Sequence, residues 1–91
     1  MKDLYIRKRT IFERKRIEAP YAEIMEIQGE IASILKEIRK ESGLSQRELK
    51  QLTGLSTKTL WELETGAQVK LESLLKCLFV LDHQLIIREL P

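Results

Sequence analysis

The sequence predicts an all-α fold of four to five helices followed by one short C-terminal β-strand. Apolar residues recur at spacings of three and four from Tyr21 to Ile38 and again from Leu71 to Leu81, which is the period of an amphipathic helix. Three of the four glycines lie between residues 43 and 66, and each closes a run with this spacing. Glycine ends helices because it adopts the left-handed conformation without a steric penalty. The chain is therefore expected to alternate helices with sharp stops.

The 91 residues suffice for one small domain, which we divide into three parts. Residues 1–28 are a basic N-terminal extension, partly helical from about residue 20; residues 29–82 are the helical domain; and residues 83–91 are a C-terminal dimerisation strand. Residues 1–18 carry seven Lys or Arg and three acids, a net charge of +4, whereas the rest of the chain carries nine and eleven, a net charge of −2. A basic arm of this kind suits nucleic acid, an acidic partner or plain solvent, and charge alone does not separate these roles.

The apolar residues of this arm follow neither a helical nor a strand period, so we expect it to be mobile alone or ordered against a partner. The first helical pattern begins after Pro20, a residue that suits the first turn of a helix. Gly29 lies inside this pattern. The pattern forms either one continuous helix or two helices divided at Gly29, so four or five helices are expected in total.

The stretch GLSQRELKQLTGLSTKTLWELETG, residues 43–66, contains two helix starts and two helix stops. Ser45 is expected to cap the first helix, with Glu48 completing a capping box, and Gly54 ends it. Ser56 and Gly66 repeat the same arrangement for the second helix. Two capped helices joined by a short turn form a helix-turn-helix in outline, although an ordinary helical hairpin has the same caps.

The second of these helices has two distinct faces. At about 100° per residue, Leu60, Leu63 and Glu64 share the inner face. The opposite face and its flanks carry the residues expected in solvent, which are Thr57, Lys58, Trp61, Glu62 and Thr65. An outward tryptophan on a short helix has three interpretations: it is half-buried under a neighbouring segment, it lies at a dimer or toxin-type protein contact, or it lies at a nucleic-acid surface. Lys58 and Glu62 have two interpretations: they contact a ligand directly, or they form a solvated i,i+4 ion pair with each other.

The chain ends in HQLIIREL, a short β-prone run. A lone strand of this length is not stable, and apolar side chains point both ways. We expect Leu85, Ile86 and Ile87 to pair with the same strand of a second copy across a two-fold axis, which makes the protein a homodimer.

The sequence offers little for catalysis. His83, the only histidine, lies near the expected helix–strand junction, where a surface or capping role is far commoner than acid–base chemistry. Cys77, the only cysteine, sits in the apolar run LLKCLFVL and is expected to be a buried thiol. No Cys/His cluster has metal-ligand spacing, and no glycine-rich phosphate loop is present. We therefore expect neither an enzyme nor a cofactor or metal site, and the single cysteine suits the cytoplasm.

The residues from about 30 to 90 resemble the Cro/CI (XRE) helix-turn-helix family, whose domain is lambda-repressor-like, and within it the HipB-type antitoxins. The resemblance rests on the Leu-Ser-Gln start of the first motif helix, the internal glycine and the Glu-x-Gly end, together with KLESLLKCLFVLDHQLIIREL. It implies a repressor that binds a palindromic operator in double-stranded DNA as a dimer. It also implies a toxin as partner, which is a kinase-like protein for HipB-type antitoxins. The protein would then repress the operon that encodes both itself and the toxin. The alternatives are a protein–protein module whose main role is to neutralise the toxin, and a phage-type regulator without a toxin.

The resemblance carries functional roles to particular residues. Gln46 matches a glutamine that contacts a DNA phosphate, Trp61 matches a variable outward position, and Arg39 and Glu64 match a buried ion pair. On this resemblance we expect the recognition helix to contact DNA through Ser56, Thr57, Lys58, Trp61 and Glu62. One departure matters, because the chain has no Asn and its recognition helix has no Gln. The bidentate reading of adenine that these side chains provide is therefore not possible there.

Overall fold

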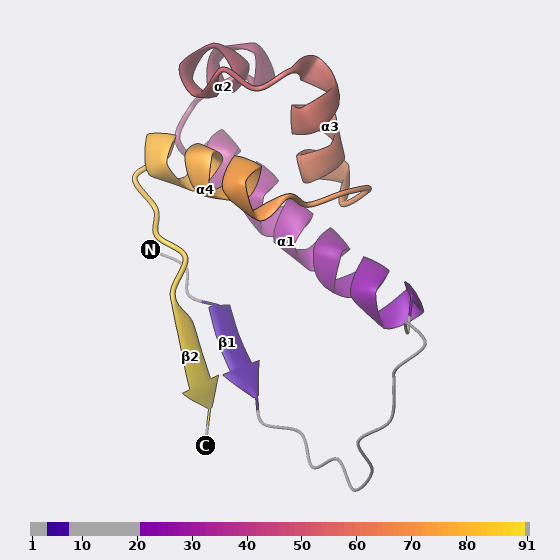
Figure 1. Cartoon of the computed structure of the whole chain (residues 1–91). Coiled ribbons are helices and arrows are strands. Elements are labelled where there is room, and N and C mark those ends of the chain that lie inside the picture. Colours follow the sequence, from indigo (N-terminus) through magenta and orange to yellow (C-terminus); the bar gives the residue numbers. More distant parts are fainter. Residues whose placement is uncertain (1–3, 8–20, 91) are drawn as a thin grey trace, which may run out of the picture.

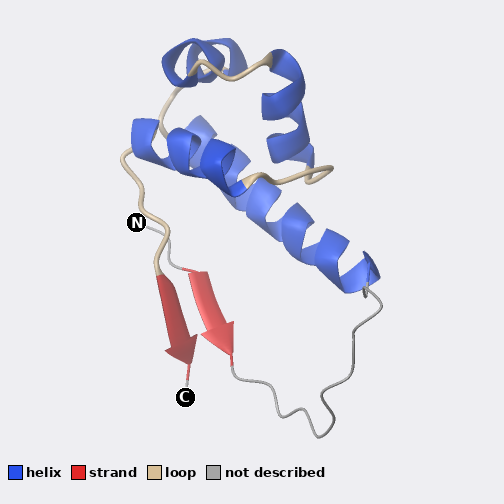
Figure 2. Ribbon diagram, in the orientation of Figure 1, coloured by secondary structure: helices blue, strands red, loops and turns tan. Residues whose placement is uncertain are grey.

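The computed structural model describes residues 4–7 and 21–90, and this part of the chain contains four helices and two strands (Figures 1 and 2). The elements run in the order β1 (Leu4–Arg7), α1 (Tyr21–Glu41), α2 (Gln46–Thr53), α3 (Thr57–Thr65), α4 (Leu71–Val80) and β2 (Ile87–Leu90). The all-α class with a short C-terminal strand is confirmed. Within the described residues, no helix is both long and apolar enough to cross a membrane.

The first helix, α1, is continuous over 21 residues, so the pattern does not divide at Gly29, and the described residues form four helices, the lower of the two numbers expected. The boundary that the sequence placed between residues 28 and 29 falls inside this helix. A single glycine costs a helix only about 1 kcal/mol, and the apolar period continues on both sides of it. The end of α3 lies against this point, since a Cβ built on Gly66 would come within 2.9 Å of the Gly29 Cα.

The core lies between the second half of α1 and the three shorter helices. Its buried members are Leu35, Ile38, Leu49, Leu60, Leu63, Leu74, Cys77, Leu78 and Leu81. The N-terminal turns of α1 project past this core (Figure 1), so the apolar stripe that began at Tyr21 is buried only in its second half. Tyr21, Ile24, Met25 and Ile27 remain exposed.

The two strands form a parallel sheet within one chain, with Leu4 opposite Ile87 and Arg7 opposite Leu90. This differs from two expectations, because residues 4–7 have regular structure and β2 finds its partner in its own chain. Parallel strands need a long connection between them, and here the helices provide it. The sheet lies beside the helices rather than among them (Figure 1). The rest of the basic arm lies outside the described residues.

Candidate nucleic-acid interface

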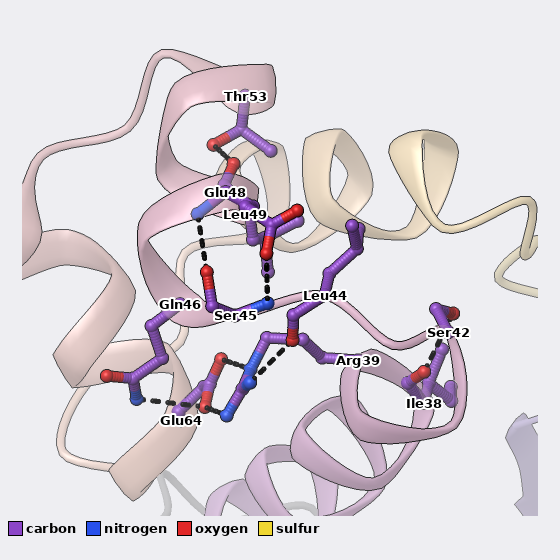
Figure 3. A network of polar contacts seen from close by, with 10 residues as sticks. All are labelled: Ile38, Arg39, Ser42, Leu44, Ser45, Gln46, Glu48, Leu49, Thr53 and Glu64. Atoms are coloured by element: carbon purple, nitrogen blue, oxygen red, sulfur yellow. Dashed lines mark hydrogen bonds and ion pairs between the residues drawn. The ribbon is translucent and has the colours of Figure 1, made fainter.

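The start of α2 is fixed by reciprocal side-chain caps. The Ser45 hydroxyl accepts from the Glu48 backbone N–H at 3.1 Å, and the Ser45 backbone N–H donates to Glu48 Oε1 at 3.2 Å (Figure 3). This is the capping box that the sequence predicts. Gly54 ends the helix in the left-handed conformation, with φ of 73°.

The caps of α3 repeat this arrangement in part. The Ser56 hydroxyl accepts from the Thr59 backbone N–H at 3.1 Å and donates to Thr59 Oγ1 at 2.9 Å. Gly66 ends the helix with φ of 77°. Because its hydroxyl has both a donor and an acceptor inside the chain, Ser56 serves α3 as a cap rather than as a free polar group.

Arg39 of α1 and Glu64 of α3 form a bidentate ion pair (Figure 3). The Arg39 Nε lies 2.7 Å from Glu64 Oε2, and Arg39 Nη2 donates to Oε1 at 3.0 Å. Arg39 Nη1 donates in addition to the Leu44 carbonyl at 2.9 Å. The two residues are only 7% and 8% exposed. With the guanidinium and carboxylate satisfied by each other, the pair ties α3 to α1 in one orientation.

Gln46, the first residue of α2, joins this network, since its Nε2 donates to Glu64 Oε1 at 3.1 Å (Figure 3). An ionised carboxylate only accepts hydrogen bonds, so this contact fixes which end of the amide faces Glu64. The amide keeps its second Nε2 hydrogen and its oxygen for other partners. The spacing of Gln46 and Glu64 along the chain follows no local period, and sequence reasoning did not find this contact.

The outer face of α3 presents Thr57, Lys58 and Trp61 to solvent, with Glu62 half-buried beside them. Trp61 is 58% exposed, so the described residues cover part of it and leave more than half of it open to solvent. Lys58 and Glu62 form no ion pair with each other. Their charged ends are therefore available to a ligand that approaches this face.

Two basic residues of α2 join this face that sequence reasoning did not name. Arg47 is exposed and Lys50 is half-buried, and Lys50 Nζ donates to Thr57 Oγ1 at 3.1 Å. Lys50 follows Gln46 by four residues, so a helical projection from Gln46 would have placed it on the same side. The α2–α3 face consequently carries three cations, at positions 47, 50 and 58, together with the half-buried carboxylate of Glu62.

The three residues expected at a dimer contact lie in three different environments. Leu85 packs against the core, Ile86 is half-buried, and Ile87 is exposed at the start of β2. Leu85 therefore belongs to the helical body, whereas Ile87 belongs to the sheet. His83 contacts the Leu81 carbonyl through Nδ1 at 2.6 Å, which is the capping role expected of it.

Among the described residues no three His, Cys, Asp or Glu side chains are grouped as a metal site would require. A family model described as helix-turn-helix matches residues 35–82, which run from the second half of α1 through α4. None of the curated proteins matches the chain.

Proposed function

The chain belongs to the Cro/CI-type (XRE) helix-turn-helix family of DNA-binding transcription regulators, and we propose that it is a repressor that binds a palindromic operator as a homodimer. The observation that carries this proposal is the fixed position of α3. Its inner carboxylate, Glu64, is held by Arg39 and Gln46, while its outer face leaves Lys58 and Glu62 unpaired with each other. In this proposal the protein is not an enzyme and works in the cytoplasm.

In this mechanism α3 enters the major groove with its outer face toward the base edges. Lys58 donates to guanine O6 or N7, and Glu62 accepts from cytosine N4. The methyl group of Thr57 packs against a thymine methyl. A two-fold dimer places two such helices about 34 Å apart, on half-sites separated by one helical turn.

Gln46 sets the register of this contact by holding a backbone phosphate. Its second Nε2 hydrogen is free for a phosphate oxygen, because the first is given to Glu64. Phosphate contacts orient a protein on the duplex without reading sequence. The Arg39–Glu64 pair thus links the residue that binds the backbone to the helix that reads the bases.

Selection of binding sites from a random duplex library tests this division of roles. We expect Lys58→Ala to lose about 1–3 kcal/mol on the preferred site and to relax one base position. Gln46→Ala should weaken binding to all sites by a similar factor. The control variant Lys76→Ala removes the same charge from α4 and should select the same sequence as wild type. If wild type and Lys58→Ala select the same sequence, Lys58 does not read a base. If no duplex is bound, the DNA-binding proposal itself is wrong.

A second function, neutralising a partner protein, is favoured by an apolar groove between α2 and α4. Leu52, Leu71, Leu75 and Phe79 line it, and Phe79 is 82% exposed. Under this proposal the protein is a HipB-like antitoxin whose partner is a kinase-like toxin, and the pair represses its own promoter. The phage-type alternative has no such partner.

Co-expression with the product of the neighbouring gene separates these alternatives. An antitoxin should rescue growth from that product and co-purify with it, and Phe79→Asp should weaken both effects while leaving DNA affinity unchanged. A neighbouring gene product that does not arrest growth would leave the repressor without a toxin.

A further inference from the structure

The N-terminal turns of α1 carry an apolar stripe that the described part of the chain leaves open to solvent. Its members are between 41% and 76% exposed, and they are Tyr21, Ile24, Met25 and Ile27. These turns project beyond the core, and no described helix or strand runs beside them (Figure 1). Farther along α1 the same stripe reaches Ile31 and Ile34, which pack against the core. The helix therefore buries this stripe at one end and leaves it uncovered at the other.

A second stripe on the same turns is acidic. Glutamates occur at positions 23, 26 and 30, and this spacing of three and four places them on one side of the helix, next to Ile27. All three are exposed. Glu26 and Glu30 form no ion pair within the described ranges of the chain. Residues 21–30 contain these three acids and no Lys, Arg or His, so the surface has a net charge of −3 beside its apolar stripe.

These two stripes restrict the kind of partner that fits. The carboxylates repel the phosphates of nucleic acids and of anionic lipids. A second copy of α1 is also a poor match. In an antiparallel pair the glutamate flank of one helix would face the glutamate flank of the other. In a parallel pair it would face Tyr21 and Gln28, which supply no cation. A complementary partner must carry cations beside an apolar stripe of its own.

We propose that residues 21–30 of α1 form a docking surface for a basic amphipathic helix of a second protein. The apolar side of that helix covers Tyr21, Ile24 and Ile27, as ridges of one helix fill grooves of another. Its Lys or Arg side chains pair with the acidic stripe. This contact is independent of DNA binding, because none of the residues that carry it lies in α2 or α3.

The end of α3 limits the length of this contact. A Cβ built on Gly66 would lie 2.9 Å from the Gly29 Cα, so α1 is in contact with its own chain from this point onward. The docked helix therefore covers about two turns of α1, a length of about 12 Å. Stable protein interfaces bury at least about 1,200 Å², which two helical turns do not supply. The complex should accordingly be transient, with micromolar affinity.

A library of helical peptides tests this proposal with a defined probe. Each peptide has about 18 residues, or about five turns, with leucines fixed at spacings of three and four. The positions flanking the leucines are Lys, Gln or Glu. Peptides are selected on the full-length protein at low salt, and the best Lys peptide is titrated by calorimetry beside its Gln version. We expect Lys to be enriched over Glu at the flanking positions by about fivefold or more.

The apolar stripe is tested by substitution. Ile24→Ser/Ile27→Ser should weaken the selected peptide by at least about tenfold. Both side chains are exposed, so the melting temperature of the free protein should stay close to that of wild type. Phe79→Ser is the matched control, because it removes an exposed apolar side chain from the groove between α2 and α4. This control should bind the peptide as wild type does.

The acidic stripe is tested separately. Glu26→Gln/Glu30→Gln keeps the size of both side chains and should weaken the Lys peptide by about fivefold while leaving its Gln version unaffected. Glu72→Gln removes an exposed carboxylate from α4 and should leave both peptides unaffected. The advantage of the Lys peptide over the Gln version should also fall in high salt, because exposed ion pairs are screened.

Several outcomes would overturn the proposal. Selection of no peptide, or of Lys and Glu peptides equally, would show that the surface has no basic helical partner. Loss of binding in the Phe79 control alone would place the docking site in the groove. A fall in the sedimentation mass of the free double serine variant would show that a second copy covers the surface. Peptide binding that tightens about tenfold in Arg14→Gln/Lys15→Gln/Arg16→Gln would show that the basic arm of the same chain occupies it.

Discussion

Glu64 connects three helices through one carboxylate. It accepts two hydrogen bonds from Arg39 of α1 and one from Gln46 of α2, while its own backbone belongs to α3. Its inward position follows from the helical period of the sequence, and an inward carboxylate requires a partner. The contact with Gln46 does not follow from any period, because it depends on how two helices meet. Local pattern therefore predicts the direction of a side chain better than it predicts its partner.

Removing the Glu64 carboxylate should strand the Arg39 guanidinium in a buried site. We expect Glu64→Ala to lower the free energy of unfolding by about 3–5 kcal/mol, measured by urea denaturation followed by circular dichroism. The double variant Arg39→Met/Glu64→Leu should recover much of this loss, because an apolar pair leaves no charge unpaired. A loss of under about 1 kcal/mol for Glu64→Ala would show that solvent reaches the arginine.

Cys77 supplies a pH-dependent test of burial. Burial raises the pKa of its thiol from 9.0 to about 11, and the Glu64 carboxylate adds to the rise. Because the folded-state pKa lies above the unfolded value, the contribution of the neutral thiol is fully present below pH 9 and is lost as the pH rises toward 11. The free energy of unfolding should therefore fall more steeply over this range for wild type than for Cys77→Ala. Equal slopes in urea denaturation would contradict the buried position.

At the scale of elements, the short helices were the most predictable part of the chain. Serine caps and terminal glycines act within a few residues, so the sequence alone located both ends of α2 and α3. Strand β1 was missed because its alternation extends over only four residues, inside a basic arm. A strand takes its hydrogen bonds from another strand, and here that partner lies about eighty residues away along the chain.

The close approach of α3 to α1 gives a prediction with an internal control. Gly66→Ala should destabilise the protein for two reasons. Alanine is strained in the left-handed conformation of residue 66, and its Cβ would lie 2.9 Å from the Gly29 Cα. Gly54→Ala carries the same strain, at φ of +73°, but meets nothing within 4 Å. Its cost should be about 1–2 kcal/mol, and the excess for Gly66→Ala measures the contact.

Gly29→Ala should act in the opposite direction. A Cβ there meets nothing within 4 Å, and alanine favours the interior of a helix over glycine by about 0.5–1 kcal/mol. We expect its free energy of unfolding to rise by that amount in urea denaturation. A loss of stability would show that α1 must bend or open at this position.

At the scale of the whole molecule, the described chain leaves apolar surface in three places away from the α2–α3 face. These are the N-terminal turns of α1, the groove between α2 and α4, and Ile87 at the start of β2. A chain of this size buries only a modest share of its surface, and a two-stranded sheet is marginal in water. The dimer contact was the least predictable feature, because the sequence of one chain does not indicate which of its surfaces contacts a second copy.

The sheet allows the dimer to be tested without disturbing the helical core. Deletion of residues 87–91 removes β2 but keeps Leu85, which packs against the core. We expect this variant to keep its helical melting transition, to shift toward monomer in sedimentation equilibrium, and to lose affinity for a palindromic duplex while retaining weak half-site binding. Each half-site is then bound independently, so the gain from a linked second site disappears.

Deletion of residues 1–7 is the matched control, because it removes β1, the partner that β2 has within its own chain. If β2 pairs with its copy through its other edge, the protein without residues 1–7 should remain dimeric. If that deletion dissociates the dimer as fully as the loss of β2, the sheet must act as a unit built from both strands. A dimer that survives both deletions would assign the two-fold contact to the helices, with the groove beside Phe79 as the surface to test next.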